Sequence, residues 1–333
     1  MLMAWLIFLA SSAAIVVAAI KLAQYGDVIA VRTRLGGMFV GALLLASATS
    51  LPELVTAVSS IQQSVPNLAA GNFFGSNMFN MLLLAVLDIV GRQARILRRV
   101  AFTHALTAAL GVSMIGLIVF FMLANMSWQI GSIGADSLIV MLVYVAGIRL
   151  IQLQGQQSGA TIEAQPSPGS KPVISLRRAA LGFGVATLVL IVVVPYLVSS
   201  SAEIAHLTGL GTGFVGIVLV AFVTSLPEVV AAVAAVRLGA FDMAVGNLFG
   251  SNVFNMFALA LVDGFYTQGR FLAAIDPAFA LAGLLGLLLT SLGLIGNLAR
   301  LERRFLFVEI DALFLIVVYL IGLYLLYSRG IGV

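Results

Sequence analysis

The sequence predicts an all-α integral membrane protein with ten transmembrane helices in two inverted five-helix repeats. Three observations predict it. Hydrophobic residues make up 62% of the chain and charged residues only 9%, whereas a soluble domain carries about 25% charged residues. The chain divides into ten apolar segments of about 20 residues or more, which is the length that crosses the hydrocarbon of a bilayer. Finally, its most polar segment occurs twice.

The duplication begins with the pentapeptide Thr-Ser-Leu-Pro-Glu, which occupies residues 49–53 and again 224–228. The offset of 175 residues continues without an insertion. It joins Gly71-Asn72 to Gly246-Asn247, Gly75-Ser76-Asn77 to Gly250-Ser251-Asn252, Phe79-Asn80-Met81 to Phe254-Asn255-Met256, and Asp88 to Asp263. Each half of the chain is therefore expected to fold in the same way, with its polar segment as the best-preserved part.

The apolar segments give the expected helices. In the first half they are 2–20, 36–61, 68–90, 101–123 and 130–150, and in the second half 179–200, 211–236, 243–265, 273–295 and 306–327. The first segment resembles a signal peptide, but it has no positively charged start and its partner in the duplication is 177–195. We therefore expect it to be a retained helix.

Positive charge predicts the orientation, because Lys and Arg gather in cytoplasmic loops. All but Arg270 and Arg329 of the 17 Lys and Arg residues lie after the first, third, fifth, seventh or ninth expected helix, or at the edges of those loops. These loops are expected to face the cytoplasm and both termini to face out. Five helices per half then invert the second repeat relative to the first, which is a known route to alternating access.

We expect three parts in the chain. Residues 1–150 form the first repeat, 151–178 a flexible cytoplasmic linker rich in Gln, Gly, Ser and Pro, and 179–333 the second repeat. No cysteine is present, which excludes disulfides, thiolate metal sites and cysteine nucleophiles. The sequence pI of about 9.7 is explained by the cytoplasmic loops, so no nucleic-acid partner is expected.

Each copy of the duplication places a carboxylate beside a proline within an apolar segment. Pro52 cannot donate to the helical ladder and disfavours a helical conformation at Leu51, so the carbonyls around 46–48 are expected to lose their partners. Irregular backbone at this depth occurs only where protein or water covers it. Freed carbonyls, hydroxyls and the carboxylate of Glu53 would form a hard-oxygen site, which suits Ca²⁺ and Na⁺. The second copy repeats the arrangement with Ala221, Thr224, Ser225 and Glu228.

The segments 68–90 and 243–265 add further oxygens. Ser76 and Asn80 are four residues apart and share one helical face, and the duplication repeats this pair as Ser251 and Asn255. The expected core is a bundle of 36–61, 68–90, 211–236 and 243–265 in which the two glutamates face each other. Two carboxylates in a low dielectric are costly unless neutralised, and one Ca²⁺, two Na⁺ or two protons would do so. This charge count favours exchange over leak.

The paired Ser-Leu-Pro-Glu and Gly-Asn-x-x-Gly-Ser-Asn-x-Phe-Asn segments resemble the two alpha-repeats of the calcium/cation antiporter superfamily, and within it the sodium/calcium exchanger branch. The resemblance covers essentially the whole chain. It implies the exchanger fold, in which 2–20 and 179–200 slide past a central core, and Na⁺/Ca²⁺ exchange by alternating access. Ca²⁺ and Na⁺ would be the transported ions, without a cofactor.

The resemblance also implies ligands. Glu53 and Glu228 would bridge Ca²⁺, helped by the carbonyls of Thr49 and Thr224. Na⁺ would bind Ser50, Ser76, Ser225 and Ser251 and the carbonyls of Ala46 and Ala221, with Asn80 and Asn255 lining the central position. The chain departs from the family where Ala48 and Val223 replace the usual Gly. Gly75 and Gly250 stand where the proton/calcium branch usually has Glu, which favours Na⁺ coupling.

Other interpretations stay open. The glutamates could be structural, each serine could bond to its own helix, and Asn72, Asn77, Asn247 and Asn252 are expected to pack helices or cap breaks rather than bind ions. An H⁺/Ca²⁺ antiporter and a passive cation channel are the alternative functions. An enzyme is not expected, because the chain has no His-Glu-x-x-His or Gly-x-Ser-x-Gly motif. We expect a monomer in the lipid bilayer of a prokaryotic inner membrane, without an obligatory protein partner.

Overall fold

The structure is a computed structural model that describes residues 1–32, 46–90, 104–131, 133–157, 174–237, 239–299, 304–305 and 308–331. The prediction of an all-α membrane fold is confirmed. Within the described residues, eight helices are long and apolar enough to span a membrane, and the bent pair Thr212–Thr224 and Leu226–Arg237 makes a ninth span. Of the expected helix 36–61, residues 36–45 lie outside the described residues, so the count of ten stays a prediction.

The elements follow one another through two halves. The first half contains α1 (Leu2–Arg32), α3 (Leu51–Gln62), α4 (Pro66–Val90), α6 (Ala105–Ala124), β1 (Gln129–Ile130), β2 (Ile133–Gly134) and α7 (Ala135–Gln157). The second contains α8 (Leu176–Thr208), α9 (Thr212–Val215), a π-helix (Gly216–Val220), α10 (Ala221–Thr224), α11 (Leu226–Arg237), α12 (Phe241–Val262), a 3₁₀-helix (Asp263–Phe265), α13 (Phe271–Ala274), α14 (Phe279–Ala299), β3 (Arg304–Phe305), β4 (Val308–Glu309) and α15 (Ile310–Ser328).

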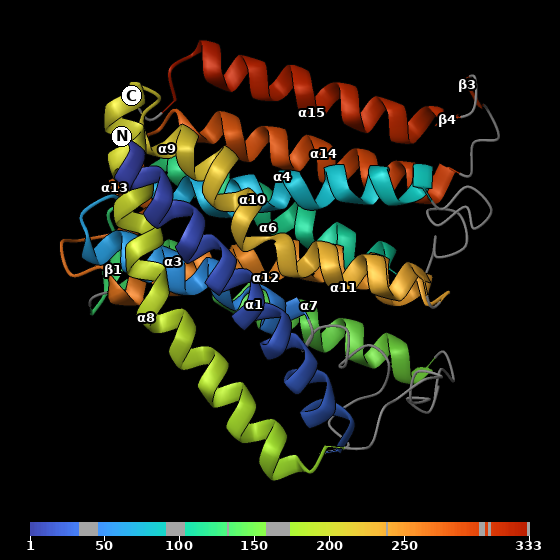
Figure 1. The fold of residues 1–333 in the computed structure, drawn as a ribbon. Coiled ribbons are helices and arrows are strands. Elements are labelled where there is room, and N and C mark those ends of the chain that lie inside the picture. Colours follow the sequence, from blue (N-terminus) through green and yellow to red (C-terminus); the bar gives the residue numbers. More distant parts are fainter. Residues whose placement is uncertain are drawn as a thin grey trace.

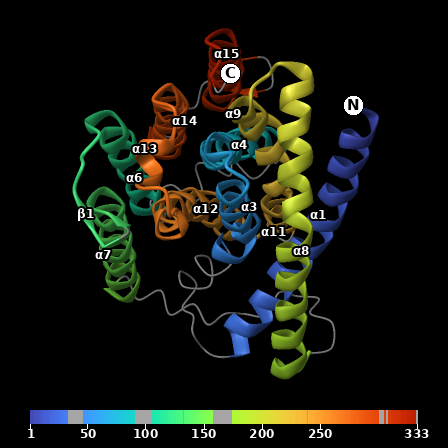
Figure 2. The ribbon, with the colours of Figure 1, turned by 90° about the vertical axis from the view of Figure 1, so that its left-hand side faces the viewer.

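The helices form a central layer with others on either side of it. In the end-on view α3, α4, α11 and α12 lie in the middle, α1 and α8 lie together on one side, and α6 and α7 lie on the other (Figure 2). The most apolar stretches of α4 and α12 are mostly buried, whereas those of α8 and α15 are mostly exposed. A larger apolar core joins α3, α4, α6, α11, α12, α14 and α15, and a smaller one follows α1 and α8.

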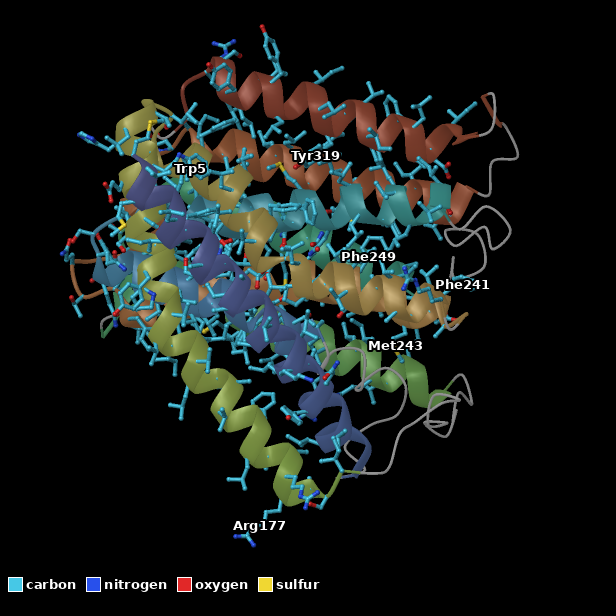
Figure 3. The ribbon with its side chains drawn as sticks, viewed as in Figure 1. Trp5, Arg177, Phe241, Met243, Phe249 and Tyr319 are labelled. Atoms are coloured by element: carbon cyan, nitrogen blue, oxygen red, sulfur yellow. The ribbon has the colours of Figure 1, made fainter. Side chains whose placement is uncertain are left out.

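The helices α1 and α8 are related by the 175-residue offset and run side by side in opposite directions (Figure 1, Figure 2). Inverted repeats require this. Both are longer than expected: α1 continues past residue 20 to Arg32, and α8 runs from Leu176 to Thr208. With 31 and 33 residues they exceed the hydrocarbon thickness of about 30 Å at about 1.5 Å per residue, so the excess is accommodated by tilt and by polar ends. Arg177, for example, projects from the end of α8 (Figure 3).

The starts of three other helices also differ from expectation. Residues 129–130 and 133–134 form the short antiparallel strand pair β1–β2, and 304–305 and 308–309 form β3–β4; the offset relates these strands residue by residue. The helices after them therefore begin at Ala135 and Ile310 rather than at 130 and 306. The ninth expected helix, 273–295, is in fact the short α13 followed by α14. The apolar residues of these hairpins continue the apolar pattern of the helices that follow, so the sequence predicted helix there.

Helices occupy both ends of the expected linker 151–178. The helix α7 continues to Gln157, and α8 begins at Leu176. Residues 158–173 lie outside the described residues. The linker and the division into domains stay predictions.

The two helical segments that contain the duplicated Ser-Leu-Pro-Glu motif are broken, but one residue earlier than predicted. Ser50 has φ −89° and ψ 9°, and Ser225 has φ −88° and ψ 2°, so the break falls on the serine in both halves. Leu51, expected to leave the helical conformation, is the first residue of α3. The reason is that Pro52 stands in the first turn of α3, where a missing N–H costs nothing because such amides have no partner within the helix.

Glycines let α4 approach the broken helix of the second half. A Cβ at Gly71 or Gly75 would collide with the backbone carbonyl of Gly213 or Ile217, and a Cβ at Gly216 would meet the carbonyl of Leu68 at 2.6 Å. The contact lies beside the π-helix, whose extra residue per turn is typical of functional sites. The prediction that Gly71 and Gly75 permit close helix packing is confirmed. At Gly246 and Gly250 the neighbours are side chains, of His104 and Ala46.

A buried ion pair ties the β1–β2 hairpin to the second half. Arg270 Nη2 donates to Asp136 Oδ2 at 2.9 Å, and both side chains are buried. Asp263 accepts from the backbone N–H of Gly134 at 2.6 Å and from that of Phe271. Asp263 is fully buried, and backbone amides from two elements satisfy its carboxylate.

Candidate ion site between the two repeats

The two duplicated glutamates lie at the centre of the molecule. Glu53 is in the first turn of α3 and Glu228 in the first turn of α11. Their exposed fractions are 0% and 1%. The first turn of a helix presents N–H groups that have no partner within the helix, and it favours negative charge. The break before each proline places a glutamate in such a turn. The local sequence therefore builds two buried carboxylates at two helix starts.

Serines from both halves donate to these carboxylates. Ser50 Oγ of the first half donates to Glu228 Oε1 at 2.9 Å, and Ser225 Oγ of the second half donates to Glu53 Oε1 at 3.2 Å. The bonds therefore cross between the repeats. Within each half, Ser76 donates to Glu53 Oε1 and Ser251 to Glu228 Oε1, each at 3.3 Å.

Four oxygens at the site have no hydrogen-bond partner in the described structure: Glu53 Oε2, Glu228 Oε2, Asn80 Oδ1 and Asn255 Oδ1. All four are buried, and the duplication relates them in two pairs. A buried oxygen without a donor costs free energy. The four oxygens at these symmetric positions are therefore available to accept a hydrogen bond or to bind a cation.

The amide nitrogens of these asparagines are bonded, which aims their oxygens. Asn80 Nδ2 donates to Asn252 Oδ1 at 2.9 Å, and Asn255 Nδ2 donates to Asn77 Oδ1 at 3.0 Å. Asn77 and Asn252 also donate to each other's backbone carbonyl, at 3.5 and 3.3 Å. The prediction that Asn77 and Asn252 pack helices is thus confirmed, since they join α4 to α12.

The breaks leave carbonyls for a ligand at Thr49 and Thr224. Among the described residues, no backbone amide donates to either carbonyl, since the ladder resumes with Leu54 N to Ser50 O at 3.3 Å and Val229 N to Ser225 O at 3.2 Å. The proline argument from the sequence placed the freed carbonyls one to three residues earlier, at 46–48.

The prediction that the carbonyl of Ala46 loses its partner is wrong. It accepts from Ser50 N at 3.0 Å and from Thr49 Oγ1 at 3.1 Å. The corresponding carbonyl of Ala221 likewise accepts from Ser225 N at 3.0 Å. Ser50 and Ser225 end the helical segments that precede the breaks, so their own amides keep these bonds.

The structure thus brings together the two carboxylates and the four serines that the sequence singled out, and it places Asn80 and Asn255 in the contact between α4 and α12. The described residues contain no cluster of three or more His, Asp or Glu side chains that could hold a metal ion. The charge of the site is therefore set by two carboxylates among neutral oxygens. Such a set suits hard cations, and a doubly charged site is neutralised by one divalent ion, two monovalent ions or two protons.

Asn72 was expected to pack helices or cap a break, and the structure confirms that it joins helices. Its Nδ2 donates to the backbone carbonyl of Glu53 at 3.4 Å, and its Oδ1 accepts from Thr224 Oγ1 at 2.9 Å. Asn72 therefore links α4 to both broken helices. Its position in the duplicated Gly-Asn-x-x-Gly-Ser-Asn motif was the available signal, but the sequence contains no information on which partner it meets.

A protein-family model matches both halves of the chain. The model described as sodium/calcium exchanger protein matches residues 3–151 and 178–328. The match covers most of both halves.

Individual relatives are more distant. The inner membrane protein YrbG of Escherichia coli is 28% identical over 247 residues, which are 72% of this chain and 71% of YrbG. The solved structure of the H⁺/Ca²⁺ exchanger CAX has a TM-score of 0.64 at 15% identity, covering 98% of this chain and 89% of that one. The sodium-calcium exchanger NCX_Mj has a TM-score of 0.57 at 17% identity, covering 97% and 98%. The TM-scores of the two solved structures show that this chain shares their fold.

Proposed function

The chain belongs to the sodium/calcium exchanger protein family, and we propose that it is a secondary antiporter that exchanges Ca²⁺ for Na⁺ by alternating access. That it is a multi-pass membrane protein of a cation antiporter family follows from the family match and from the apolar spans. The coupling ion, the ligands and the orientation in the membrane are the proposal.

One observation carries the proposal. Glu53 Oε2, Glu228 Oε2, Asn80 Oδ1 and Asn255 Oδ1 are buried, related in pairs by the duplication and without a donor among the described residues. Two carboxylate and two amide oxygens are a donor set for a hard cation. Because the pair carries two negative charges, the loaded site is neutral with one Ca²⁺ or two Na⁺, and the ion-free site is the costly state.

Each residue group has a proposed role. Glu53 and Glu228 bridge Ca²⁺, and the carbonyls of Thr49 and Thr224 complete its shell. The four serines hold the carboxylates through Oε1. A hydroxyl that donates keeps its lone pairs, so the same serines can also bind Na⁺. The carbonyls of Ala46 and Ala221 join only if the hydroxyl bond to each is released.

The coupling ion is assigned from the sequence. Gly75 and Gly250 stand at the positions where the proton/calcium branch usually has a carboxylate. Without that carboxylate the site has no further acid to carry protons, which favours Na⁺. The charge bias of the loops supports a location in the inner membrane with both termini outside and the linker 151–178 in the cytoplasm.

The test is ⁴⁵Ca²⁺ uptake into proteoliposomes loaded with Na⁺ and diluted into Na⁺-free buffer. We expect uptake that requires the Na⁺ gradient and that is lost in Glu53→Gln. The matched control is Glu203→Gln, which removes an exposed carboxylate of α8 and should leave uptake intact. Uptake without Na⁺ dependence, or normal uptake by Glu53→Gln, would contradict Na⁺/Ca²⁺ exchange through this site.

The second candidate is an H⁺/Ca²⁺ antiporter. It is favoured by the carboxylates themselves, since each is bonded through Oε1 and has Oε2 without a donor, an arrangement that a proton satisfies as well as a cation does. Ca²⁺ uptake driven by a pH gradient in the absence of Na⁺ would favour it. Single-channel currents would instead indicate a passive cation channel.

A further inference from the structure

The two halves of the site contain the same side chains but bond them differently. Asn72 and Asn247 are equivalent by the duplication, and so are Thr224 and Thr49. Thr224 Oγ1 donates to Asn72 Oδ1 at 2.9 Å. The equivalent atoms of Asn247, both Oδ1 and Nδ2, have no partner among the described residues, although Asn247 is 1% exposed.

The difference cannot arise from the bonding groups themselves, since they are identical. Asn72 also donates to the backbone carbonyl of Glu53, and the carbonyl of Glu228 would be the matching acceptor for Asn247. The hydroxyl of Thr49 instead donates to Ala46 O within its own helix, at 3.1 Å. Asn72 is therefore bonded across helices, and Asn247 has no partner among the described residues.

The helices on the two sides of the site show the same inequality. At the end of α3, Gln63 Nε2 donates to the carbonyl of Pro195 in α8 at 3.1 Å, and Val55 packs against the apolar core of α1 and α8. Its equivalent by the duplication, Val230 in α11, is 42% exposed. The face of α3 is thus closed against its neighbour, and the equivalent face of α11 is open.

We propose that Asn72 and Asn247 are positioning residues that exchange hydrogen bonds between the two access states. In the present state Thr224 and the Glu53 carbonyl bond Asn72, and Asn247 is unpaired. In the opposite state Thr49 and the Glu228 carbonyl bond Asn247, and Asn72 loses its partners. This deepens the proposed function and rests on its alternating access, because inverted repeats reach the second state by exchanging their conformations.

The exchange gives each asparagine an opposite effect on the equilibrium. Asn72→Ala removes bonds that exist only in the present state, and Asn247→Ala removes bonds that exist only in the other. A ligand or bond shifts a two-state ratio only by its difference between the states. A hydrogen bond of ordinary strength should change the ratio roughly fivefold.

The chain offers a direct readout because it contains no cysteine. Val55→Cys and Val230→Cys, introduced separately, report the two faces, since both lie two residues after a glutamate. The rate of labelling by a polar thiol reagent is measured in permeabilised vesicles without Na⁺ or Ca²⁺. The ratio of the Val230→Cys rate to the Val55→Cys rate measures the balance of states, and it does not require transport. A failure of Na⁺-dependent uptake is thereby distinguished from a failure of this proposal.

We expect Asn72→Ala to lower this ratio roughly fivefold and Asn247→Ala to raise it or leave it high. Thr224→Val should act like Asn72→Ala, and Thr49→Val like Asn247→Ala, and these variants keep the backbone carbonyls. In proteoliposomes both alanine variants should slow turnover while Ca²⁺ affinity in detergent stays within a fewfold of the parent. A ratio that falls in both asparagine variants, or that Asn72→Ala and Thr224→Val leave unchanged, would overturn the proposal.

Discussion

The pairs α4–α12 and α1–α8 are each built from two helices that the duplication relates, yet they pack by different chemistry. Between α4 and α12, four hydrogen bonds donated by side-chain amides link Asn77, Asn80, Asn252 and Asn255. Between α1 and α8 the contact is an apolar seam that includes Ile15, Leu22 and Leu190. Directional bonds hold two helices in one register, whereas an apolar seam tolerates shifts along the helix. The central pair is therefore suited to be a fixed frame, and the outer pair to move.

Hydroxyl groups sharpen the contrast. In α1, Ser12 Oγ donates to Phe8 O at 2.6 Å, and in α8, Ser201 Oγ donates to Leu197 O at 2.7 Å. These side chains satisfy their polar groups within their own helix. At the centre, the serines reach across to the other repeat's carboxylate. Serines therefore bond within their own helix at the periphery, and at the site they form hydrogen bonds between the two repeats.

The largest expected effect on Ca²⁺ affinity comes from the two carboxylates of the site, Glu53 on α3 and Glu228 on α11. Glu53→Gln and Glu228→Gln should each lower Ca²⁺ affinity by about 100-fold or more, because one of the two charges that neutralise the ion is lost. Isothermal titration calorimetry of purified protein measures it. Glu203→Gln on the outer pair is the control and should bind Ca²⁺ as the parent does. Equal affinity in all three variants would place the ion elsewhere.

Glycine substitutions should separate the two regions next. Gly75→Ala should destabilise the protein by about 1–3 kcal/mol, because its Cβ would collide with backbone of the π-helix. A Cβ at Gly184 in α8 meets nothing within 4 Å, so Gly184→Ala should stabilise by about 0.5–1 kcal/mol through helix propensity. Thermal unfolding in detergent should rank them on opposite sides of the parent. The reverse order would contradict the close packing of α4.

Removing one amide of the central frame should have a comparable or smaller effect. Asn77→Ala removes the acceptor of Asn255 Nδ2 and the donor to the Asn252 carbonyl, at a cost of about 1–3 kcal/mol. Adding Asn255→Ala to it should cost less than the sum of the single changes, since both remove the bond from Asn255 Nδ2 to Asn77 Oδ1. Thermal unfolding of the four combinations completes the cycle. Strictly additive losses would mean that the two asparagines do not act as a unit.

The smallest effect is expected from the outer pair. Ser12→Ala and Ser201→Ala remove hydroxyls that bond only to their own helix, so each should change stability by no more than about 0.5 kcal/mol. The same unfolding measurement checks this, with Ser50→Ala and Ser225→Ala as the central counterparts. Losses at the periphery as large as those at the centre would remove the distinction between a fixed frame and a movable pair.

Much of this arrangement could be predicted from the sequence because duplication supplies two independent views of one site. Glu53, Glu228 and the four serines meet as predicted. Hydropathy detected the spans but not their ends, since α1 and α8 extend into polar sequence such as Lys21 and Gln24 that no apolar window includes.

The errors have local physical causes. The break at Ser50 rather than at Leu51 depends on whether the proline is counted in the first turn of a helix or inside one, and the sequence admits both. The π-helix beside Gly216 has no signature of its own. The unequal bonding of Asn72 and Asn247 could not be predicted at all, because identical residues in identical motifs cannot specify which of two states a molecule occupies.

The crossed serine bonds have a consequence for the origin of the chain. Each glutamate is bonded by a serine from the other half, so neither half alone holds a complete site. A gene that encoded only one half could have produced a working transporter only if two copies of its product entered the membrane in opposite orientations and paired. Fusion of two such copies would then have fixed one orientation for each half and freed them to diverge, as His104 and its counterpart Phe279 have done.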